Sequence, residues 1–454
     1  MDALAQRFGA IFKAYDVRGT VPDQFDAEMA GRIGAAFARF AADSDPQTTR
    51  VLVARDMRPS GEEMVAAFAA GVASQGLDVV DLGLGSTDLL YYAAGSLDAP
   101  GAMFTASHNP AQYNGIKFCL SGARPVGEES GLFAIRDLAA AGVPPTGSTG
   151  SVSQQDVLDA FAAHVRSFVD VSTLTPLKVV ADTANGMGGL VVPAAFSGLP
   201  FELEVMYGEL DGTFPNHPAD PIQPENQVDL CARVLEVGAD VGLAFDGDAD
   251  RVFLVDEKGV GLSGSTATAI LADALVRRNG GGKVVYNLIC SKAVPEVVLE
   301  AGGEPIRSRV GHSFIKGVMA ETGAIFGGEH SAHYYFTDNY RADSGLIAAV
   351  LVLEQMCRRG IPLSELRQPY ERYAASGEIN TRVEDTSVVI ERVAAAYAGQ
   401  HQDRLDGLTV DLGDWWFNLR ASNTEPLLRL NLEAPTADDV AARVAEVTGH
   451  FGAV

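Results

Sequence analysis

Short runs of apolar and β-branched residues alternate along this chain with longer, alanine-rich amphipathic segments. The clearest examples are expected strands at 51–54, 177–181 and 283–286 and expected helices at 26–42, 61–75 and 265–278. Amphipathic helices between short strands are typical of α/β units with parallel or mixed sheets. The alternation therefore predicts an α/β protein.

Length alone favours fewer modules than the turn-forming segments indicate. A chain of 454 residues would contain three domains at about 150 residues each. The segment 141–150 is rich in Pro, Gly and Ser and marks a first boundary, after which Ser153 and Asp156 predict a helix start. Further boundaries are expected after Asp256 and near Gln368. Four modules are therefore expected, at 1–148, 149–256, 257–368 and 369–454.

The charge balance restricts the partners of this chain. It contains 34 Lys and Arg against 59 Asp and Glu, which gives a net charge of −25. Such a field disfavours binding to nucleic acid and to anionic membrane surfaces, and a site for an anionic substrate must be locally positive. The first residues carry charges without an apolar core, and no stretch approaches the roughly 18 apolar residues of a membrane-spanning helix. The four cysteines lie far apart with no C-x-x-C pair, which predicts reduced thiols and a cytoplasmic location.

A serine flanked by polar residues follows the apolar stretch 102–104. In the run Thr105-Ala106-Ser107-His108-Asn109-Pro110, the Asn-Pro pair predicts a turn at a strand end. Loops of this kind present side chains to a cleft. Taken alone, Ser107 would be an ordinary turn hydroxyl.

An acidic loop follows the expected strand at 239–245. Asp246, Asp248 and Asp250 alternate with small residues, so their carboxylates can converge on one hard cation. An EF-hand is disfavoured because Arg251 stands where that loop requires Gly, and because 252–255 has the pattern of a strand. Two alternatives remain, namely an aspartyl-phosphate enzyme with Asp246 as nucleophile and a solvated acidic turn. A divalent metal is favoured because three close carboxylates repel one another unless something neutralises them.

Two further loops combine residues that suit a sugar phosphate. Glu329 and Ser331 stand in a glycine-rich loop with two histidines, and a carboxylate beside a hydroxyl suits the vicinal hydroxyls of a sugar. The spacing of those histidines suggests a zinc pair, but the H-E-x-x-H pattern is absent. Near the C-terminus, a guanidinium, two hydroxyls and an amide can wrap a phosphate. They belong to Arg420, Ser422, Asn423 and Thr424.

These four loops occur in this order, one per module, and the combination resembles the α-D-phosphohexomutase superfamily, specifically its phosphomannomutase/phosphoglucomutase branch. The resemblance covers nearly the whole chain. Besides the loops above it includes the segments 12–19, 114–118 and 311–316. It implies three similar α/β modules with mixed sheets and a smaller C-terminal α+β domain around a central cleft.

The resemblance also implies a role for each matching residue. Ser107 would carry a phosphoryl group, and Asp246, Asp248 and Asp250 would hold Mg²⁺ together with a phosphoserine oxygen on Ser107. The remaining residues fall into four groups. Lys117 would be the general base, with His312 in the same pocket and Arg251 facing the phosphoserine; Tyr15, Arg18 and His108 would handle substrate; Glu329 and Ser331 would bind sugar hydroxyls; Arg420, Ser422, Asn423 and Thr424 would bind the non-reacting phosphate.

The implied function is a Mg²⁺-dependent isomerase that interconverts the 6- and 1-phosphates of mannose, and of glucose as well. Hexose 1,6-bisphosphate would be both its activator and its intermediate. A phosphoglucosamine mutase and a non-catalytic sugar-phosphate sensor of the same fold are the alternatives. The sequence predicts neither the oligomeric state nor the preferred epimer.

The chain departs from members of this superfamily at three places in the expected sugar site. Ile289 stands where many of them carry a Lys that contacts phosphate, and Val310 replaces a hydroxyl residue before Gly311. The sequence Gly-Glu-His-Ser differs from the Gly-Glu-Gln-Ser of phosphoglucosamine mutases and from the Gly-Glu-Glu-Ser of dedicated phosphoglucomutases. The sugar pocket is therefore expected to differ from theirs.

Overall fold

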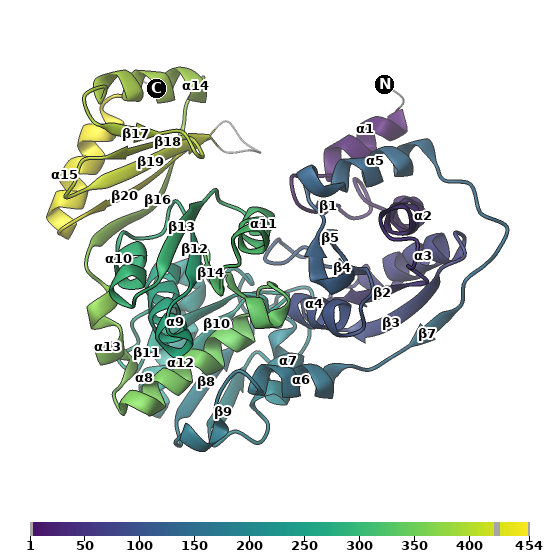
Figure 1. Ribbon diagram of the computed structural model, residues 1–454, viewed down its shortest axis with the longest axis horizontal. Coiled ribbons are helices and arrows are strands. Elements are labelled where there is room, and N and C mark those ends of the chain that lie inside the picture. Colours follow the sequence, from purple (N-terminus) through teal and green to yellow (C-terminus); the bar gives the residue numbers. More distant parts are fainter. Residues whose placement is uncertain (1–2, 422–426, 453–454) are drawn as a thin grey trace. The chain divides into compact units, whose positions relative to one another are not determined.

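The polypeptide folds into two units, each built from two stretches of chain. The computed structural model describes residues 3–421 and 427–452, and Figure 1 labels most of their helices and strands. The first unit contains the chain up to Ser263 together with Ser331–Glu365. The second unit contains Gly264–His330 and the chain from Leu366 onward.

The first sheet of the first unit has the strand order β1-β5-β4-β2-β3-β7, with β6 beside β5. Strands β4, β2, β3 and β7 are parallel neighbours, whereas β1, β5 and β6 join through antiparallel pairs. The sheet is therefore mixed. The strands are β1 Val17–Thr20, β2 Arg50–Arg55, β3 Asp78–Leu84, β4 Gly101–Phe104, β5 Tyr113–Leu120, β6 Arg124–Pro125 and β7 Val152–Gln154. The helices are α1 Ala3–Ile11, α2 Ala27–Ser44, α3 Gly61–Ala73, α4 Thr87–Ser96 and α5 Leu132–Ala141.

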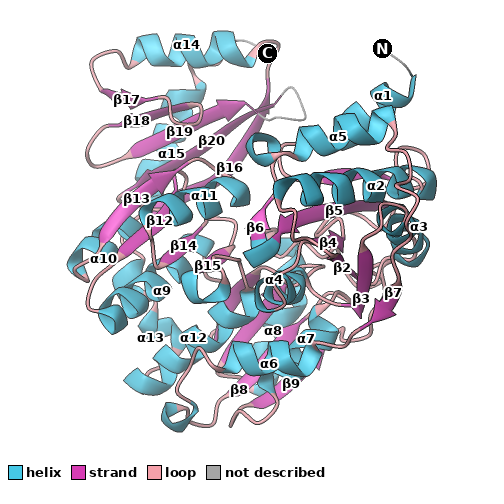
Figure 2. Cartoon of the chain, turned by 45° about the vertical axis from the view of Figure 1, so that its right-hand side comes forward, coloured by secondary structure: helices cyan, strands magenta, loops and turns pink. Residues whose placement is uncertain are grey.

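Helices cover both faces of this sheet. Val51 and Val53 of β2 join one buried cluster with residues of α1, α2, α3 and α5, and Figure 2 shows α5 and α2 above β5. The opposite face packs against α4, because a Cβ added at Gly101 would lie 3.2 Å from Leu90. Successive strand residues point to opposite faces, so both layers are apolar. The expected helix at 26–42 is confirmed as α2, whose N-cap Asp26 accepts a 2.9 Å hydrogen bond from the N–H of Met29.

The second sheet of this unit has the order β11-β10-β8-β9, with parallel pairs except between β10 and β11. The strands are β8 Lys178–Asp182, β9 Glu202–Met206, β10 Val241–Phe245 and β11 Val252–Asp256. The other helices of this unit are α6 Leu158–Arg166, α7 Gly188–Phe196, α8 Val228–Val237 and, after the short strand β15 Tyr334–Phe336, α12 Gly345–Arg359. Helix α13 Leu363–Leu366 follows at the boundary with the second unit. The strands expected at 239–245 and 252–255 are thus confirmed.

One expected helix start is wrong. Ser153 lies in β7, whose pairing with β3 completes the first sheet, and α6 begins only at Leu158. Asp156 stands before that helix, and its Oδ1 accepts a 2.9 Å hydrogen bond from the N–H of Leu158. The local signal was overridden at Ser153 because pairing with a distant strand decides β-structure.

In the second unit, β12 pairs in parallel with β13 on one side and with β14 on the other. These elements are β12 Lys283–Asn287, β13 Glu304–Ser308 and β14 Phe326–Gly328, with the helices α9 Gly264–Asn279, α10 Ala293–Glu300 and α11 His312–Thr322. The expected strand at 283–286 and the expected helix at 265–278 are confirmed. The arrangement is again an α/β module.

The C-terminal part of the second unit is an antiparallel sheet of order β16-β20-β19-β18-β17. Its elements are β16 Ala374–Arg382, α14 Thr386–Ala396, β17 His401–Asp403, β18 Leu408–Asp411, β19 Trp416–Ala421, β20 Leu427–Ala434 and α15 Ala437–Thr448. Both helices pack against one apolar face of the sheet, which carries Leu408, Phe417 and Leu430. The predicted fold class, α/β modules followed by a smaller α+β domain, is confirmed.

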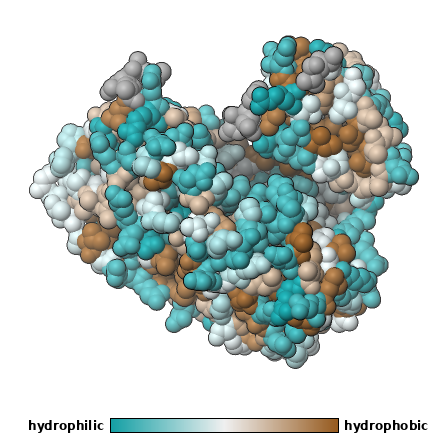
Figure 3. Space-filling model, turned by 180° about the vertical axis from the view of Figure 1, so that it is seen from behind, coloured by the Kyte–Doolittle hydropathy of each residue, from teal (hydrophilic) through white to brown (hydrophobic). Residues whose placement is uncertain are grey.

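Apolar and polar residues are interspersed on the surface seen in Figure 3. On the face shown in Figure 3, apolar residues occur in several separate groups among hydrophilic ones. Among the described helices, each falls short of the length or of the apolar character that a membrane crossing requires.

Candidate active site

Ser107 lies in the turn that follows strand β4. Its backbone N–H donates a 2.8 Å hydrogen bond to Oγ1 of Thr105, and the residue is 5% exposed. Its φ is +49°, in the left-handed region that residues other than glycine rarely adopt. The turn therefore holds the Ser107 side chain at the carboxyl end of a parallel strand, the edge where α/β sheets bind ligands.

The acidic loop 246–251 joins the antiparallel strands β10 and β11. Asp246, Asp248 and Asp250 are all buried, and one carboxylate oxygen from each lies within 4.8 Å of the others. The sequence left a solvated acidic turn open, but burial of all three carboxylates is incompatible with it. The spacing instead supports a site that concentrates negative charge.

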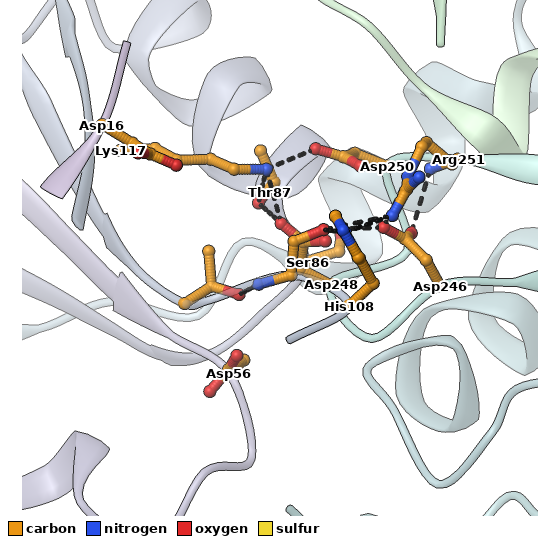
Figure 4. A network of polar contacts seen from close by, with 12 residues as sticks. Asp16, Asp56, Ser86, Thr87, His108, Lys117, Asp246, Asp248, Asp250 and Arg251 are labelled. Atoms are coloured by element: carbon orange, nitrogen blue, oxygen red, sulfur yellow. Dashed lines mark hydrogen bonds and ion pairs between the residues drawn. The ribbon is translucent and has the colours of Figure 1, made fainter. Parts of the chain in front are cut away.

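The serine turn and the acidic loop meet, and Figure 4 shows His108 of the turn beside Asp246 and Arg251 of the loop. The Oγ of Ser107 donates a 2.9 Å hydrogen bond to Oδ2 of Asp246. The same Oδ2 accepts a 2.9 Å bond from Nε of Arg251, whose Nη2 lies 3.4 Å from the Ser107 oxygen. A Cβ added at Gly247 would lie 2.5 Å from the carbonyl oxygen of Ser107, so glycine permits this approach. The structure thus joins a hydroxyl, a carboxylate and a guanidinium.

Lys117 on strand β5 reaches the same loop from the other side. Its Nζ donates to Oδ2 of Asp248 at 2.7 Å and to Oδ2 of Asp250 at 2.6 Å. Burial disfavours the charge of Lys117, but the two carboxylates outweigh this effect and raise its pKa well above the usual value. For Asp248, burial is likewise outweighed by Lys117 and by the hydrogen bond from Thr87, so its pKa is lowered. Lys117 is therefore charged in this arrangement.

Thr87, at the start of helix α4, is a member of the site that sequence reasoning missed. Its Oγ1 donates a 2.5 Å hydrogen bond to Oδ2 of Asp248, and its N–H donates to the backbone carbonyl of Asp248 at 3.1 Å. The preceding Ser86 caps the helix by accepting from the N–H of Leu89. A Ser-Thr-Asp run is an ordinary helix start, so the sequence offered only a capping signal here.

His108 and Arg251 form a second contact beside Ser107. Nη2 of Arg251 lies 2.7 Å from Nδ1 of His108, which is also 3.2 Å from the Ser107 oxygen. Burial and the neighbouring guanidinium lower the pKa of His108 well below its usual value. Burial also raises the pKa of Asp246 well above its usual value, although Arg251 opposes the shift. His108 is therefore a neutral acceptor next to a fixed cation.

The carboxylate triad fits a divalent cation. Oδ1 of Asp248 and Oδ1 of Asp250 are buried and have no hydrogen-bond partner among the described residues. Among the described residues, the lysine and arginine ion pairs to these carboxylates come from Lys117 and Arg251, so one negative charge remains for a cation to balance when all three carboxyls are ionised. Hard divalent cations prefer oxygen ligands of this kind.

Arg18 of β1 contacts the serine loop, while Tyr15 precedes that strand and is partly buried. The guanidinium of Arg18 donates to Oδ1 of Asn109 at 2.6 Å and to Oδ2 of Asp16 at 2.5 Å. Its position beside the serine loop suits an anionic ligand.

The remaining expected site residues occur in several places. Ser331, in the first unit, lies 3.2 Å through its Oγ from Nδ1 of His333. In the second unit, Oε2 of Glu329 accepts bonds from Nδ2 of Asn287 at 3.0 Å and from the N–H of Gly311 at 3.3 Å. His312 is the first residue of α11, and Arg420 near the end of β19 donates to Glu378 at 3.2 Å. Ser422, Asn423 and Thr424 lie outside the described residues.

Comparison with known proteins gives consistent matches over the chain. Models of the phosphoglucomutase/phosphomannomutase family match at 9–142 (α/β/α domain I), 159–259 (domain II), 263–373 (domain III) and 378–450 (C-terminal domain). A phosphomannomutase of Salmonella montevideo is 41% identical over 435 residues, covering 93% of this chain and 94% of that protein. A protein of Xanthomonas campestris pv. campestris named phosphohexose mutases is 42% identical, with coverage of 93% and 94%.

A solved structure matches as well. The crystal structure of a phosphoglucomutase/phosphomannomutase family protein from Burkholderia thailandensis has a TM-score of 0.88 and 32% sequence identity to this chain. The match covers 99% of this chain and 97% of that one. Both the sequence and the fold of this chain therefore match that protein over nearly its full length.

Proposed function

The chain belongs to the phosphoglucomutase/phosphomannomutase family of phosphohexose mutases, and we propose that it interconverts the 6- and 1-phosphates of mannose and of glucose. Ser107 carries the phosphoryl group, and hexose 1,6-bisphosphate is the intermediate and the activator that loads the serine. The names of the Salmonella and Xanthomonas relatives support this choice of substrates. The observation that carries the proposal is the 2.9 Å hydrogen bond between Ser107 Oγ and Asp246 Oδ2.

The proposed transfer needs positioning and charge balance more than covalent help. The bond between phosphorus and Ser107 Oγ breaks while one forms to the free hydroxyl oxygen of the hexose phosphate. Lys117 accepts the hydroxyl proton, and the serine oxygen takes up a proton as it leaves. Transfer of the other phosphoryl group of the bisphosphate back to Ser107 completes the isomerisation. Arg251, which lies 3.4 Å from the serine oxygen, supplies fixed positive charge.

Lys117 can act as a base only after its contacts with Asp248 and Asp250 are released, because these contacts keep it charged. We propose Mg²⁺ as the cation held by Asp246, Asp248 and Asp250, with a phosphoserine oxygen on Ser107 as a further ligand. Such a cation supplies charge that balances the carboxylates and polarises the phosphoryl group. Its presence would also lower the pKa of Lys117 toward the range of a base.

The other roles remain proposals from family resemblance. Tyr15, Arg18 and His108 are assigned to substrate handling, and His312 to the reaction pocket. Glu329 and Ser331 are assigned to binding of the sugar hydroxyls. The non-reacting phosphate is assigned to Arg420, Ser422, Asn423 and Thr424. The module bounds 1–148, 149–256, 257–368 and 369–454 are proposed in the same way. The net charge of −25 supports a protein that binds neither nucleic acid nor membrane surfaces, and a cytoplasmic location stays a prediction.

A kinetic comparison tests the proposed substrates. Mannose 1-phosphate, glucose 1-phosphate and glucosamine 1-phosphate are assayed side by side with Mg²⁺ and the matching bisphosphate, and kcat/KM is measured for each. We expect turnover of the mannose and glucose substrates at comparable efficiency and weaker turnover of the glucosamine substrate. A clear preference for the glucosamine substrate would assign a phosphoglucosamine mutase, and absence of turnover with all three would leave a sugar-phosphate sensor.

A further inference from the structure

The side chain of Arg58 lies inside the loop that carries Ser107. Arg58 is 1% exposed, and its guanidinium donates four hydrogen bonds to backbone carbonyls of the chain that runs from the end of β4 to the first residue of β5. The acceptors are the carbonyl oxygens of Ser107 at 2.8 Å, Asn109 at 2.6 Å, Pro110 at 2.8 Å and Tyr113 at 2.9 Å. One side chain thus contacts the backbone of the phosphoryl-carrying residue and of three residues that follow it.

These contacts supply hydrogen-bond donors to carbonyl groups of the serine loop. Residues 105–112 form no helix or strand, so their carbonyls need other partners where they are buried. A buried carbonyl left without a partner destabilises its conformation, and the planar fork of an arginine presents several N–H groups in fixed directions. The same loop contains Ser107 at φ +49°, a conformation that must be imposed by its surroundings.

Arg58 is in turn held from other sides. Its Nε donates to Oδ2 of Asp56 at 3.1 Å, and its N–H donates to Oδ1 of the same carboxylate at 3.0 Å. The ring of Phe214 lies 5.2 Å from the guanidinium carbon. A Cβ added at Gly212 would lie 2.7 Å from the Cα of Arg58, so the segment with Phe214 packs directly against it. The guanidinium is therefore held at its Nε by the Asp56 carboxylate and on its face by the Phe214 ring.

We propose that Arg58 is a positioning residue for phosphoryl transfer, which sets where Ser107 Oγ stands relative to Asp246 and Arg251. The inference rests on the proposed function, because it presumes that Ser107 carries the phosphoryl group. Arg58 acts only through the backbone of the loop, since its guanidinium is directed at carbonyl oxygens. In-line transfer depends on such placement, because a shift of about 1 Å in a reacting group can slow a reaction about a hundredfold.

The test compares Arg58→Lys with Arg50→Lys. A lysine keeps the charge, but its single nitrogen cannot reach all four carbonyls. Arg50 is the matched control: it stands at the other end of β2 and donates a 2.8 Å bond to one carbonyl, that of Leu97. Each protein is loaded with hexose 1,6-bisphosphate. The single-turnover rate of transfer from phosphoserine to hexose phosphate is then measured per phosphorylated molecule, so that a change in the folded fraction does not enter.

For Arg58→Lys we expect transfer to slow about a hundredfold while KM changes by less than about threefold. The phosphorus NMR resonance of the phosphoserine is expected to broaden or split, because the loop then samples several conformations. Arg50→Lys should behave as the wild type in both measurements. Wild-type transfer and one narrow resonance in Arg58→Lys would overturn the proposed role.

A second variant decides the question if Arg58→Lys does not fold. Phe214→Leu removes the ring that fixes the face of the guanidinium. The hydrogen bonds of Arg58 to the loop are then held less rigidly, so a severalfold slower transfer with a broadened resonance is expected. Unchanged transfer in Phe214→Leu would then overturn the role of Arg58. A wild-type protein that takes up no phosphoryl group at Ser107 would instead contradict the proposed function.

Discussion

The hydroxyl oxygen of Ser107 lies 2.9 Å from Oδ2 of Asp246, although 139 residues separate the two in the chain. Each follows the carboxyl end of a strand with parallel neighbours, β4 in the first sheet and β10 in the second. The site is therefore built where two sheets of one unit present their loops to each other. Through this contact, the serine hydroxyl and the acidic loop form one candidate active site.

The closeness of these loops depends on a glycine. We predict that Gly247→Ala destabilises the protein by about 1–3 kcal/mol, because its Cβ would lie 2.5 Å from the Ser107 carbonyl oxygen. Displacing that carbonyl also moves the serine, so kcat should fall by about tenfold or more. Denaturant unfolding and steady-state kinetics measure the two effects.

The control for this substitution is Gly9→Ala in helix α1. A Cβ at Gly9 meets nothing within 4 Å, so this change should leave kcat unaltered and stabilise the helix by about 0.5–1 kcal/mol. If Gly247→Ala retained wild-type kcat and stability, the two loops would not be in contact as described.

Asp88 gives the protein a pH-dependent stability. Burial raises the pKa of this carboxyl to about 7, although hydrogen bonds from Ser344 and Ser86 oppose the shift. A carboxyl whose pKa is higher in the folded than in the unfolded state takes up protons on folding. The contribution of Asp88 to the free energy of unfolding is therefore largest below the pKa of the unfolded state. It declines as pH rises from about 4 to 7 and is constant above that range.

We predict that Asp88→Asn removes this dependence. Between about pH 5 and pH 8, the free energy of unfolding of the wild type should fall by about 3 kcal/mol more than that of the variant. The comparison cancels the other titrating groups, which both proteins share. Parallel pH profiles for the two proteins would mean that Asp88 is ionised with an ordinary pKa in the folded state.

The carboxylate triad should make stability depend on a divalent cation. At about a hundred times its dissociation constant, Mg²⁺ should raise the free energy of unfolding by about 2.7 kcal/mol, and a chelator should reverse the effect. Asp248→Asn should abolish the rise, whereas Asp43→Asn, at an exposed carboxylate paired with Arg39, should retain it. Thermal unfolding with and without Mg²⁺ checks this. An equal rise in both variants would place the cation elsewhere.

Much of the fold could be predicted because local patterns and tertiary structure agree. The expected helix at 61–75 is α3 Gly61–Ala73, and the expected strand at 177–181 is β8 Lys178–Asp182. Ser153 shows the limit, since β7 exists through its pairing with β3, a partner more than 60 residues away in the chain. Periodicity reports burial of a face and carries no information on distant strand partners.

The chemistry of the candidate site was visible in the sequence, but its supporting contacts were not. The type and spacing of the three aspartates indicated a site, whereas Ser107 gained a role only in combination with the other loops, and Lys117 only through the family resemblance. Thr87 and Arg58 carry no such signal, because a helix-capping Thr and a lone Arg occur throughout proteins. Their roles follow only from which atoms the folded chain brings within hydrogen-bond distance.

Intact-mass spectrometry of the protein after incubation with hexose 1,6-bisphosphate and Mg²⁺ tests the proposal that Ser107 carries the phosphoryl group. We expect a mass increase of one phosphoryl group that peptide sequencing maps to Ser107. It should be lost on addition of excess hexose 6-phosphate and be absent from Ser107→Ala. An unmodified wild type, or a phosphoryl group mapped to Asp246 or to any other residue, would contradict it.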